Sequence, residues 1–311
     1  MRQFKGTARK VKTPIVSITG NRYEGDAIRE AVDLLPVNEI IGRGDTVVIT
    51  PNWVQDKPPE TGVVVGPESL RQLIRYIKER DPGQIVIATG SGGDPTQQVM
   101  ENVGYKKVIE EEGVEFIDLN HGDFITVELN HHSPGTTKLH KLIEELDVLI
   151  SFTQIKVHQE ATVSLGIKNI ALGWPPTEEH GAPKMDKGIH RDLHGFIRAM
   201  GEKIPIDLTI LSGDQGMVGT GPSGGKPVNS DLIVAGTDPV ATDVVGTRLL
   251  GFRPQAVRYL YDLIREGIGV GDLNKVQLRG IPLNEAERIF SWAAYGHDVI
   301  LDKDELLSLH I

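Results

Sequence analysis

The most informative absence in this 311-residue sequence is cysteine, which does not occur at all. A chain without cysteine cannot form disulfides, use a thiol nucleophile, or bind zinc or an iron–sulfur cluster through thiolates. The sequence therefore excludes a cysteine-ligated iron–sulfur cluster as cofactor. The absence also fits a cytoplasmic protein, which is the localisation that we expect.

Two further absences limit the function classes. No apolar run approaches the roughly 20 residues that a membrane helix needs, and the basic start MRQFKGTARKVKTP has no apolar stretch after it, as a secretory signal would. The net charge of −10 is unlike the basic surface that binds nucleic-acid phosphates. We expect neither a membrane nor a nucleic acid as partner. A local basic pocket stays compatible with this charge, and an oligomer is left open.

What the sequence does contain is an alternation of strand-like and helix-like runs. The strand-like runs are short, rich in β-branched residues, and often end in Gly, Asn or Asp. They are 14–20, 45–52, 84–90, 114–119, 146–152, 206–213 and 231–238. Repeated βα units predict an α/β fold with a mostly parallel β-sheet and helices on both faces. Two lobes remain an alternative, with a boundary near residues 130–145.

Helical periodicity fills the intervals between these strands. In ESLRQLIRYIKER, the apolar residues Leu70, Leu73, Ile74 and Ile77 form one stripe, as in a helix that covers a core. Further helix-like runs are 27–36, 96–113, 137–147, 160–173, 238–251 and 255–267. In such sheets ligands bind beyond the carboxyl ends of the strands. The polar residues that follow the strands, beginning with Asn52, are therefore candidates for a site.

A first group of candidate residues lies at the end of one strand. In a continuing strand, Gln154, Lys156 and His158 share a face, because side chains alternate with a period of two. A lysine there can hold an anion or carry a proton, and a histidine can act as a base or a metal ligand. The alternative is a strand end that meets solvent.

The next run carries basic residues on apolar segments. Lys168 falls in an apolar helical stripe with Asn169 beside it, and Lys184 follows in a linker. Lysine is costly to bury unless it is paired, so this placement predicts a site. A lysine whose head reaches solvent from the helix rim is the alternative.

Two histidines complete this region. His190 and His194 are four residues apart, which places both imidazoles on one face of a helix. With His158 as a third ligand they could bind a divalent metal ion. The pair lacks the glutamate of an HExxH motif, and two packed histidines are the alternative.

Two glycine-rich segments could cradle an anion through backbone N–H groups. One is ATGSGGDPT (88–96), in which Asp94 resembles a helix N-cap. The other is GDQGMVGTGPSGGKP (213–227), where Asp214 directly follows a strand; a long surface loop is the alternative. A literal GxGxxG occurs there, but no helix follows it, so we reject a dinucleotide site. The glycines expected to bind ligand are Gly90, Gly92, Gly93, Gly219 and Gly221.

In this order these motifs resemble the family DUF362, a domain of unknown function from bacteria and archaea. The strongest matches are DVLISFTQIKVHQEATVSLGIKNIALG, HRDLHGFIRAM, LTILSGDQGMVGTGPSGGKP and LIVAGTDPVATDVVGTRLLG. The resemblance covers residues 12–255, which leaves 256–311 as a helical and strand extension that packs on the core. Many relatives have Pro-Lys where this chain has Gln154 and Ile155. Many also carry ferredoxin-like cysteines, which this chain lacks, so an iron–sulfur label cannot transfer.

The resemblance supplies a pattern and no reaction. Our first interpretation is an enzyme with a basic, histidine-containing cleft that acts on a small carboxylate or phosphate, with a divalent metal ion as an optional cofactor. The lactate racemase class, whose site places lysines and histidines around a nickel cofactor, is similar in residue types alone. Our alternative is a non-catalytic module that binds a small anion, metal or cofactor. The residues expected to be catalytic are Lys156, His158, Lys168 and Asp214; those expected to bind ligand include Asn52, Asn169 and Lys184.

Overall fold

The structure, a computed structural model, describes residues 9–20 and 23–299. Its strands are β1 (Ile15–Gly20), β2 (Thr46–Pro51), β3 (Gln84–Thr89), β4 (Glu115–Asp118), β5 (Phe124–Glu128), β6 (Thr136–His140), β7 (Val148–His158), β8 (Thr162–Ser164), β9 (Leu208–Val218), β10 (Lys226–Val228), β11 (Leu232–Gly236) and β12 (Gln277–Gly280). Residues 300–311 of the expected C-terminal extension lie outside the described part.

The α-helices of the described residues connect these strands. They are α1 (Asp26–Asp33), α2 (Val37–Ile40), α3 (Pro67–Lys78), α4 (Thr96–Asn102), α5 (Tyr105–Glu112), α6 (Gly166–Gly173), α7 (Thr177–His180), α8 (Leu193–Lys203), α9 (Pro239–Leu249), α10 (Arg258–Arg265) and α11 (Leu283–Tyr295). Short 3-10 helices are η1 (Pro59–Thr61), η2 (Lys141–Glu144), η3 (Asp186–Arg191), η4 (Pro254–Ala256) and η5 (Leu273–Lys275).

Ten strands of the described residues form one sheet, in the order β12-β1-β11-β9-β7-β2-β3-β4, with β8 beside β7 and β10 beside β9. Strands β9, β7, β2, β3 and β4 run parallel, which confirms the predicted α/β fold with a mostly parallel sheet. Strand β11 is antiparallel to both neighbours. The chain reaches it from β9 through β10 and without a crossover helix, and only such crossovers make neighbours parallel.

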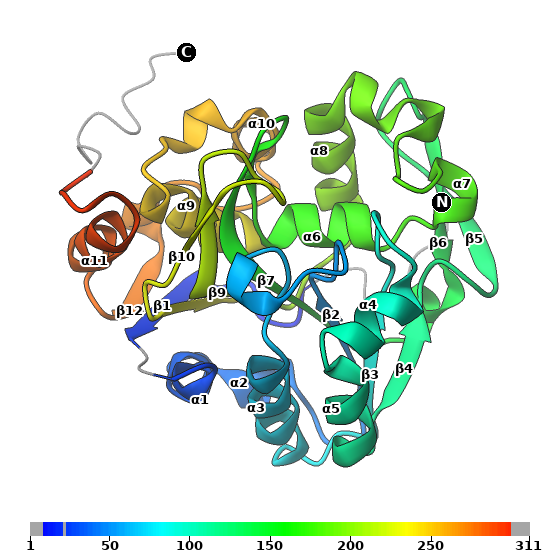
Figure 1. The fold of residues 1–311 in the computed structure, drawn as a ribbon, viewed down its shortest axis with the longest axis horizontal. Helices are drawn as coiled ribbons and strands as arrows, with labels where there is room; N and C mark the ends of the chain where they lie inside the picture. Colours follow the sequence, from blue (N-terminus) through cyan, green and yellow to red (C-terminus); the bar gives the residue numbers. More distant parts are fainter. Residues whose placement is uncertain (1–8, 21–22, 300–311) are drawn as a thin grey trace.

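Helices cover both faces of the sheet, as the alternating strands predicted (Figure 1). Along β2, Val47 and Ile49 pack into an apolar cluster shared with α1, α3 and α5. Val48 points to the opposite face, into a cluster shared with α6, α8, α9 and α10. The period of two along buried strands thus divides one apolar run between two core layers.

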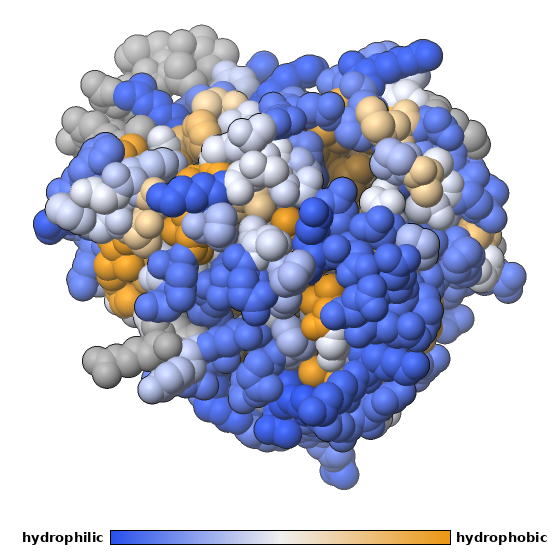
Figure 2. Space-filling model, viewed as in Figure 1, coloured by the Kyte–Doolittle hydropathy of each residue, from blue (hydrophilic) through white to orange (hydrophobic). Residues whose placement is uncertain are grey.

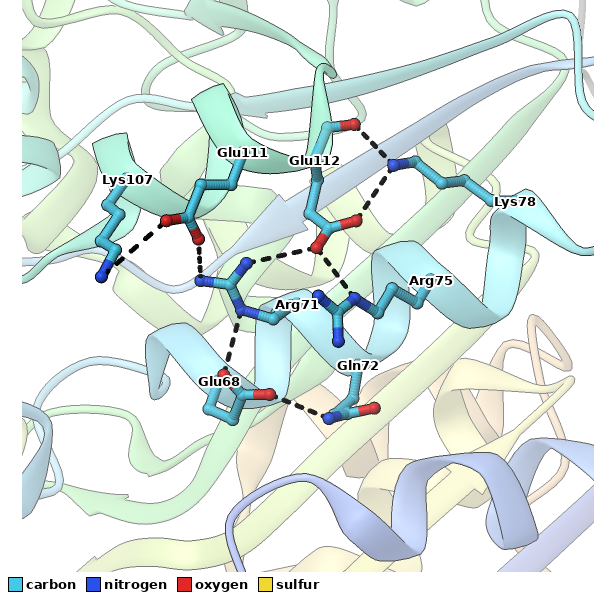
Figure 3. A network of polar contacts seen from close by, with 8 residues as sticks. All are labelled: Glu68, Arg71, Gln72, Arg75, Lys78, Lys107, Glu111 and Glu112. Carbon is cyan, nitrogen blue, oxygen red and sulfur yellow. Dashed lines mark hydrogen bonds and ion pairs between the residues drawn. The ribbon is translucent and has the colours of Figure 1, made fainter.

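A network of ion pairs and hydrogen bonds connects α3 with α5 (Figure 3). The Glu112 side chain, 7% exposed, receives hydrogen bonds from Arg71, Arg75 and Lys78. Lys78 also donates to the Glu112 main-chain carbonyl, at the last residue of α5. Because a helix end leaves its last carbonyls without helical partners, this lysine serves both the carboxylate and the C-terminus of α5.

Three local predictions were wrong. The run 137–147 is β6 followed by η2, because its alternation of buried Thr137 and Leu139 has the period of a strand. The helix expected over 160–173 begins only at Gly166, after strand β8. Asp94 is not the N-cap of α4, and its carboxylate instead accepts a hydrogen bond from the backbone N of Asp56 (2.8 Å). Residues 130–145 lie in the β5–β6 hairpin and η2, and a division into lobes there stays a prediction.

The face of the molecule in Figure 2 is mostly hydrophilic, with hydrophobic residues in smaller patches between polar ones. In the part of the chain that the structure describes, no helix has both the length and the apolar character required to cross a bilayer.

Candidate functional site

A cavity of about 220 Å³ opens where β2, β3 and the extended β7 end. This is the place at which ligands bind in parallel sheets. Its volume lies below the roughly 300–1,000 Å³ of drug-sized sites, and therefore suits a small metabolite. The predicted site residues that line it are Asn52, Gly90, Gly92, Gly93, His158, Lys168, Asn169, Lys184 and His190.

Lys168 stands in the first turn of α6 and is 8% exposed. Burial lowers the pKa of its amino group to about 8, against the opposing influence of the Glu160 carboxylate. Among the described residues, none accepts a hydrogen bond from this amino group. The cavity thus contains a cationic donor whose partner must come from water or a ligand.

The helix that carries Lys168 is anchored by a buried carboxylate. Asp243 of α9 accepts hydrogen bonds from the backbone N of Gly166 (2.9 Å) and of Ile167 (3.0 Å). These are N–H groups of the first turn of α6, which have no partner inside the helix. Burial raises the pKa of Asp243 to about 7, although both hydrogen bonds act to lower it. Asp243 therefore anchors the start of α6 next to Lys168, and it is not part of the cavity lining.

His158 at the end of β7 is held as one tautomer. Its Nδ1 accepts hydrogen bonds from the backbone N of Glu160 (3.1 Å) and of Ala161 (3.2 Å). A ring nitrogen that accepts has no proton, so the proton of the neutral ring is on Nε2. Burial, together with the charges of Lys168 and Lys156, lowers the pKa of His158 to about 2. His158 is therefore a neutral hydrogen-bond donor at the cavity wall.

Two asparagine side chains contribute hydrogen-bond acceptors to the cavity, in contrast to the donors Lys168 and His158. The Nδ2 of Asn52 donates to Gln154 Oε1 (2.7 Å), and the Nδ2 of Asn169 donates to the Thr50 carbonyl (2.8 Å) and to Ser151 Oγ (3.1 Å). With the amide nitrogens directed into the protein, the carbonyl oxygens are the atoms that each amide can offer to a ligand. The lining thus combines a cation and a neutral donor with two acceptors.

Lys184 lies in the linker before η3 and closes the cavity against α6. Its amino group donates to the carbonyls of Gly90 (3.0 Å), Leu172 (2.9 Å) and Gly173 (3.5 Å). Burial lowers its pKa to about 7, while the Asp118 carboxylate acts in the opposite direction. Because three carbonyls occupy its donors, Lys184 joins the β3 loop to the end of α6 and is not a free ligand group.

Glu160 belongs to the site and was missed by the sequence reasoning. Its carboxylate contacts the Nδ1 of His190, which lines the cavity. It also acts electrostatically on Lys168. The available signal was its position two residues after His158 at the end of the strand. The Glu160 carboxylate thus places one negative charge near the cationic Lys168.

Several predicted site residues lie outside the cavity lining, in contrast to the expectation from the sequence. Lys156 is fully buried and donates to the Val63 carbonyl (2.8 Å), and burial beside Lys168 lowers its pKa well below the usual value. Asp214 Oδ2 accepts from the backbone N of Gly25 (3.0 Å) on the other side of the sheet from α6. The residues outside the lining are Lys156, His194, Asp214, Gly219 and Gly221.

Gly221 has a packing role in place of the expected anion contact. A Cβ at this position would come within 2.0 Å of the Val157 carbonyl oxygen. The neighbouring Pro222 reaches the cavity wall, and the Gly221 carbonyl accepts from the backbone N of Gln159 (3.0 Å). The glycine loop therefore supports the end of β7, which carries His158.

The three histidines predicted to share a metal ion do not fit one. His190 lies in η3 and His194 in α8, so the two are not on one continuous helix. His194 Nδ1 accepts a hydrogen bond from the backbone N of Tyr259 (3.2 Å), so the proton of the neutral ring is on Nε2. The Nδ1 of His158 is likewise occupied, and its Nε2 bears the proton. A metal ligand needs a ring nitrogen with a free lone pair, so this donor set does not suit a divalent ion.

The comparisons with known proteins identify a family and leave the reaction open. The sequence model of DUF362, a domain of unknown function, matches residues 47–248, and the chain belongs to this family. It is 25% identical over 215 residues to a thylakoid-associated protein of Synechocystis sp. (strain ATCC 27184 / PCC 6803 / Kazusa). That match covers 69% of this chain and 65% of the relative, so the chain spans less than two thirds of the length of that protein.

A solved structure is also similar. The lactate racemase apoprotein from Thermoanaerobacterium thermosaccharolyticum matches with a TM-score of 0.40 and 21% identity. The match covers 73% of this chain and 55% of that one.

Proposed function

We propose that this protein is an enzyme that binds a small carboxylate or phosphate compound in the cavity at the ends of β2, β3 and β7. Lys168 is the group that holds the anion and exchanges a proton with it. The observation that supports this is the buried amino group of Lys168, which no described residue pairs through a hydrogen bond. The fold desolvates this ammonium group in part, which lowers its pKa and carries a free-energy cost that no hydrogen-bond partner in the described part of the chain offsets. An anionic ligand would offset that cost.

The polarity of the lining narrows the substrate class. The Nε2–H of His158 is a second donor for the anionic group, while the carbonyl oxygens of Asn52 and Asn169 accept. A ligand that matches both kinds of group carries a hydroxyl or amino group beside its carboxylate or phosphate. With a pKa of about 8, Lys168 is about nine-tenths protonated at pH 7. It can therefore take up or release a proton close to neutral pH.

A metal ion takes no part in this proposal, because the ring nitrogens of His158 and His194 are engaged. Our second candidate function is a non-catalytic module that binds the same class of anion. Both candidates require Lys168 for binding, and only turnover separates them.

Binding is tested by calorimetry with glycolate, acetate and inorganic phosphate on wild type, Lys168→Met and Lys107→Met. Methionine keeps the length of the side chain and removes its charge, and the 75% exposed side chain of Lys107 provides the matched control. We expect wild type and Lys107→Met to bind glycolate or phosphate equally, and Lys168→Met to bind at least about tenfold more weakly. Equal binding by Lys168→Met would contradict the proposal.

Turnover is tested by incubating the bound hydroxy acid with the protein in D₂O. The neutral amine form of Lys168 would take a proton from the carbon next to the carboxylate and, after exchange with solvent, return a deuteron to it, which NMR detects. Exchange in wild type that is lost in Lys168→Met supports the enzyme. Ligand binding without any exchange or other conversion supports the binding module.

A further inference from the structure

A second group of histidines meets outside the cavity. His131 and His132 lie in the loop after β5, and Asp192 lies at the junction of η3 and α8. Their potential ligand atoms all lie within 4.8 Å of one another. The side chain of His131 is only 3% exposed, whereas His132 is exposed. The fold thus brings a buried imidazole, an exposed one and a carboxylate together.

The contacts of His131 indicate which of its ring nitrogens bears a proton and which one faces the Asp192 carboxylate. Its Nδ1 lies 3.3 Å from the Pro134 carbonyl oxygen, which can only accept. Nδ1 therefore bears a proton, and Nε2 faces Asp192 Oδ2, 3.4 Å away; with one proton on the ring, Nε2 directs a lone pair at this oxygen. Two acceptors that face each other in this way are bridged either by a proton on Nε2 or by a metal cation.

The separation of the two atoms indicates which cation fits. A charged N–H···O contact is about 2.7–2.9 Å long, shorter than the 3.4 Å observed. Two ligands that bind one ion tetrahedrally at about 2.0–2.1 Å are about 3.4 Å apart, by the geometry of the tetrahedral angle. The observed distance therefore fits two ligands of one tetrahedral metal ion and is longer than a short charged hydrogen bond.

Asp192 is oriented for this role through its other oxygen. Its Oδ1 accepts hydrogen bonds from the backbone N of Gly195 (3.1 Å) and from Arg258 (3.0 Å). Oδ2 remains directed at His131. Carboxylates that bind a metal ion are oriented in the same way, by neighbours that hydrogen-bond to the carboxylate and not to the ion. The charge of Arg258 opposes a nearby cation, but its side chain is 60% exposed, so solvent screens this repulsion.

We propose that His131, His132 and Asp192 form a site for one divalent transition-metal ion of the Zn²⁺ class. Imidazole and carboxylate are ligands that this ion takes, and an open fourth position is left for water. The ion would tie the loop after β5 to the start of α8, next to His190 and Leu193 in the cavity wall. The inference does not depend on the proposed function, because it concerns other residues and needs no substrate.

The test uses full-length, tag-free protein freed of metal with a chelator. Zn²⁺ affinity is measured by competition with a chromophoric chelator, and the geometry by the visible spectrum of Co²⁺. His132→Ala and Asp192→Asn each remove one ligand while the buried His131 stays, and the amide oxygen introduced by Asp192→Asn can still accept from Gly195. His121→Ala, whose side chain is 81% exposed, is the matched control.

We expect one equivalent of Zn²⁺ in wild type and in His121→Ala. In His132→Ala and Asp192→Asn the affinity should fall about tenfold or more. Co²⁺ should give intense visible bands in wild type that weaken in both ligand variants. Less than one equivalent of Zn²⁺ at micromolar concentrations, or unchanged affinity in both variants, would overturn the proposal. His131 and Asp192 would then form a proton-linked pair without a metal.

Discussion

Asp243→Asn tests whether the carboxylate that anchors α6 is neutral in the folded protein. Asp243 is fully buried, and its two oxygens accept from the backbone N of Gly166 and Ile167. Burial raises its pKa from 3.8 to about 7. The unfolded chain ionises near the lower value. The stability associated with the protonated group is therefore complete below pH 3.8 and is lost as the pH rises through about 7.

The size of this loss follows from the two pKa values. Between pH 5 and pH 8, linkage predicts that wild type loses about 3 kcal/mol of unfolding free energy through Asp243 alone. The amide introduced by Asp243→Asn cannot ionise, so the variant lacks this loss. The nitrogen of that amide cannot accept, which leaves one of the two backbone N–H groups without an acceptor and costs about 1–3 kcal/mol at every pH.

The assay is urea denaturation of both proteins at pH 5, 6, 7 and 8. We expect the variant to gain about 3 kcal/mol on wild type across this range. Other titrating groups cancel in the difference when they lie far from the mutated site. Asp123→Asn removes a carboxylate that is 80% exposed and should give a flat difference. A difference that is flat, or that grows in favour of wild type, would mean that Asp243 is ionised at pH 5.

Two further predictions concern Lys184, which lines the cavity, and Gly221, which lies outside its lining. Lys184→Met removes the donor to three carbonyls and should lower the unfolding free energy by about 1–3 kcal/mol. Lys168→Met should leave the unfolding free energy unchanged or raise it. Equal losses for the two variants in urea denaturation would contradict the different roles of these lysines. Gly221→Ala places a Cβ 2.0 Å from a backbone oxygen and should cost about 1–3 kcal/mol. In Gly224→Ala the nearest atom is 3.2 Å away, so a thermal melt should show a smaller loss than for Gly221→Ala.

The sheet was predictable because its strands are short β-branched runs with clear ends. For the same reason the position of the cavity could be predicted, since Asn52 and Gly90 follow β2 and β3 and His158 is the last residue of β7. Strand β11 was assigned the correct residues but not its direction. Direction depends on whether a helix or a hairpin leads into a strand, and the loop before β11 carried no pattern for β10.

The error at Lys156 has a different cause. The period of two correctly places Gln154 and Lys156 on one side of β7. The segment before α3 covers this side of β7, and the Val63 carbonyl in that segment accepts a hydrogen bond from Lys156. Periodicity gives the side of a strand but not the loop that covers it, so a buried structural lysine and a ligand-binding lysine give the same sequence pattern. Glu160 was missed for the same reason: its partner His190 is 30 residues away in the sequence, and periodicity does not predict such a contact.

Lys168 and Lys184 show why burial alone does not identify a functional lysine. Both are less than a tenth exposed, and burial lowers the pKa of both amino groups. They differ in their acceptors. Three carbonyls surround the amino group of Lys184, so its charge already has partners and its removal should cost stability.

Lys168 has a carboxylate within electrostatic range but no hydrogen-bond acceptor among the described residues. The amino group of Lys168 therefore depends on the cavity for its partner, water or a ligand, whereas that of Lys184 has protein acceptors. A buried group in this position, at the end of a helix anchored by Asp243, is explained when a ligand supplies the missing acceptor. Lys184 therefore has a structural role, while the lack of an acceptor at Lys168 supports the binding role that we propose for it.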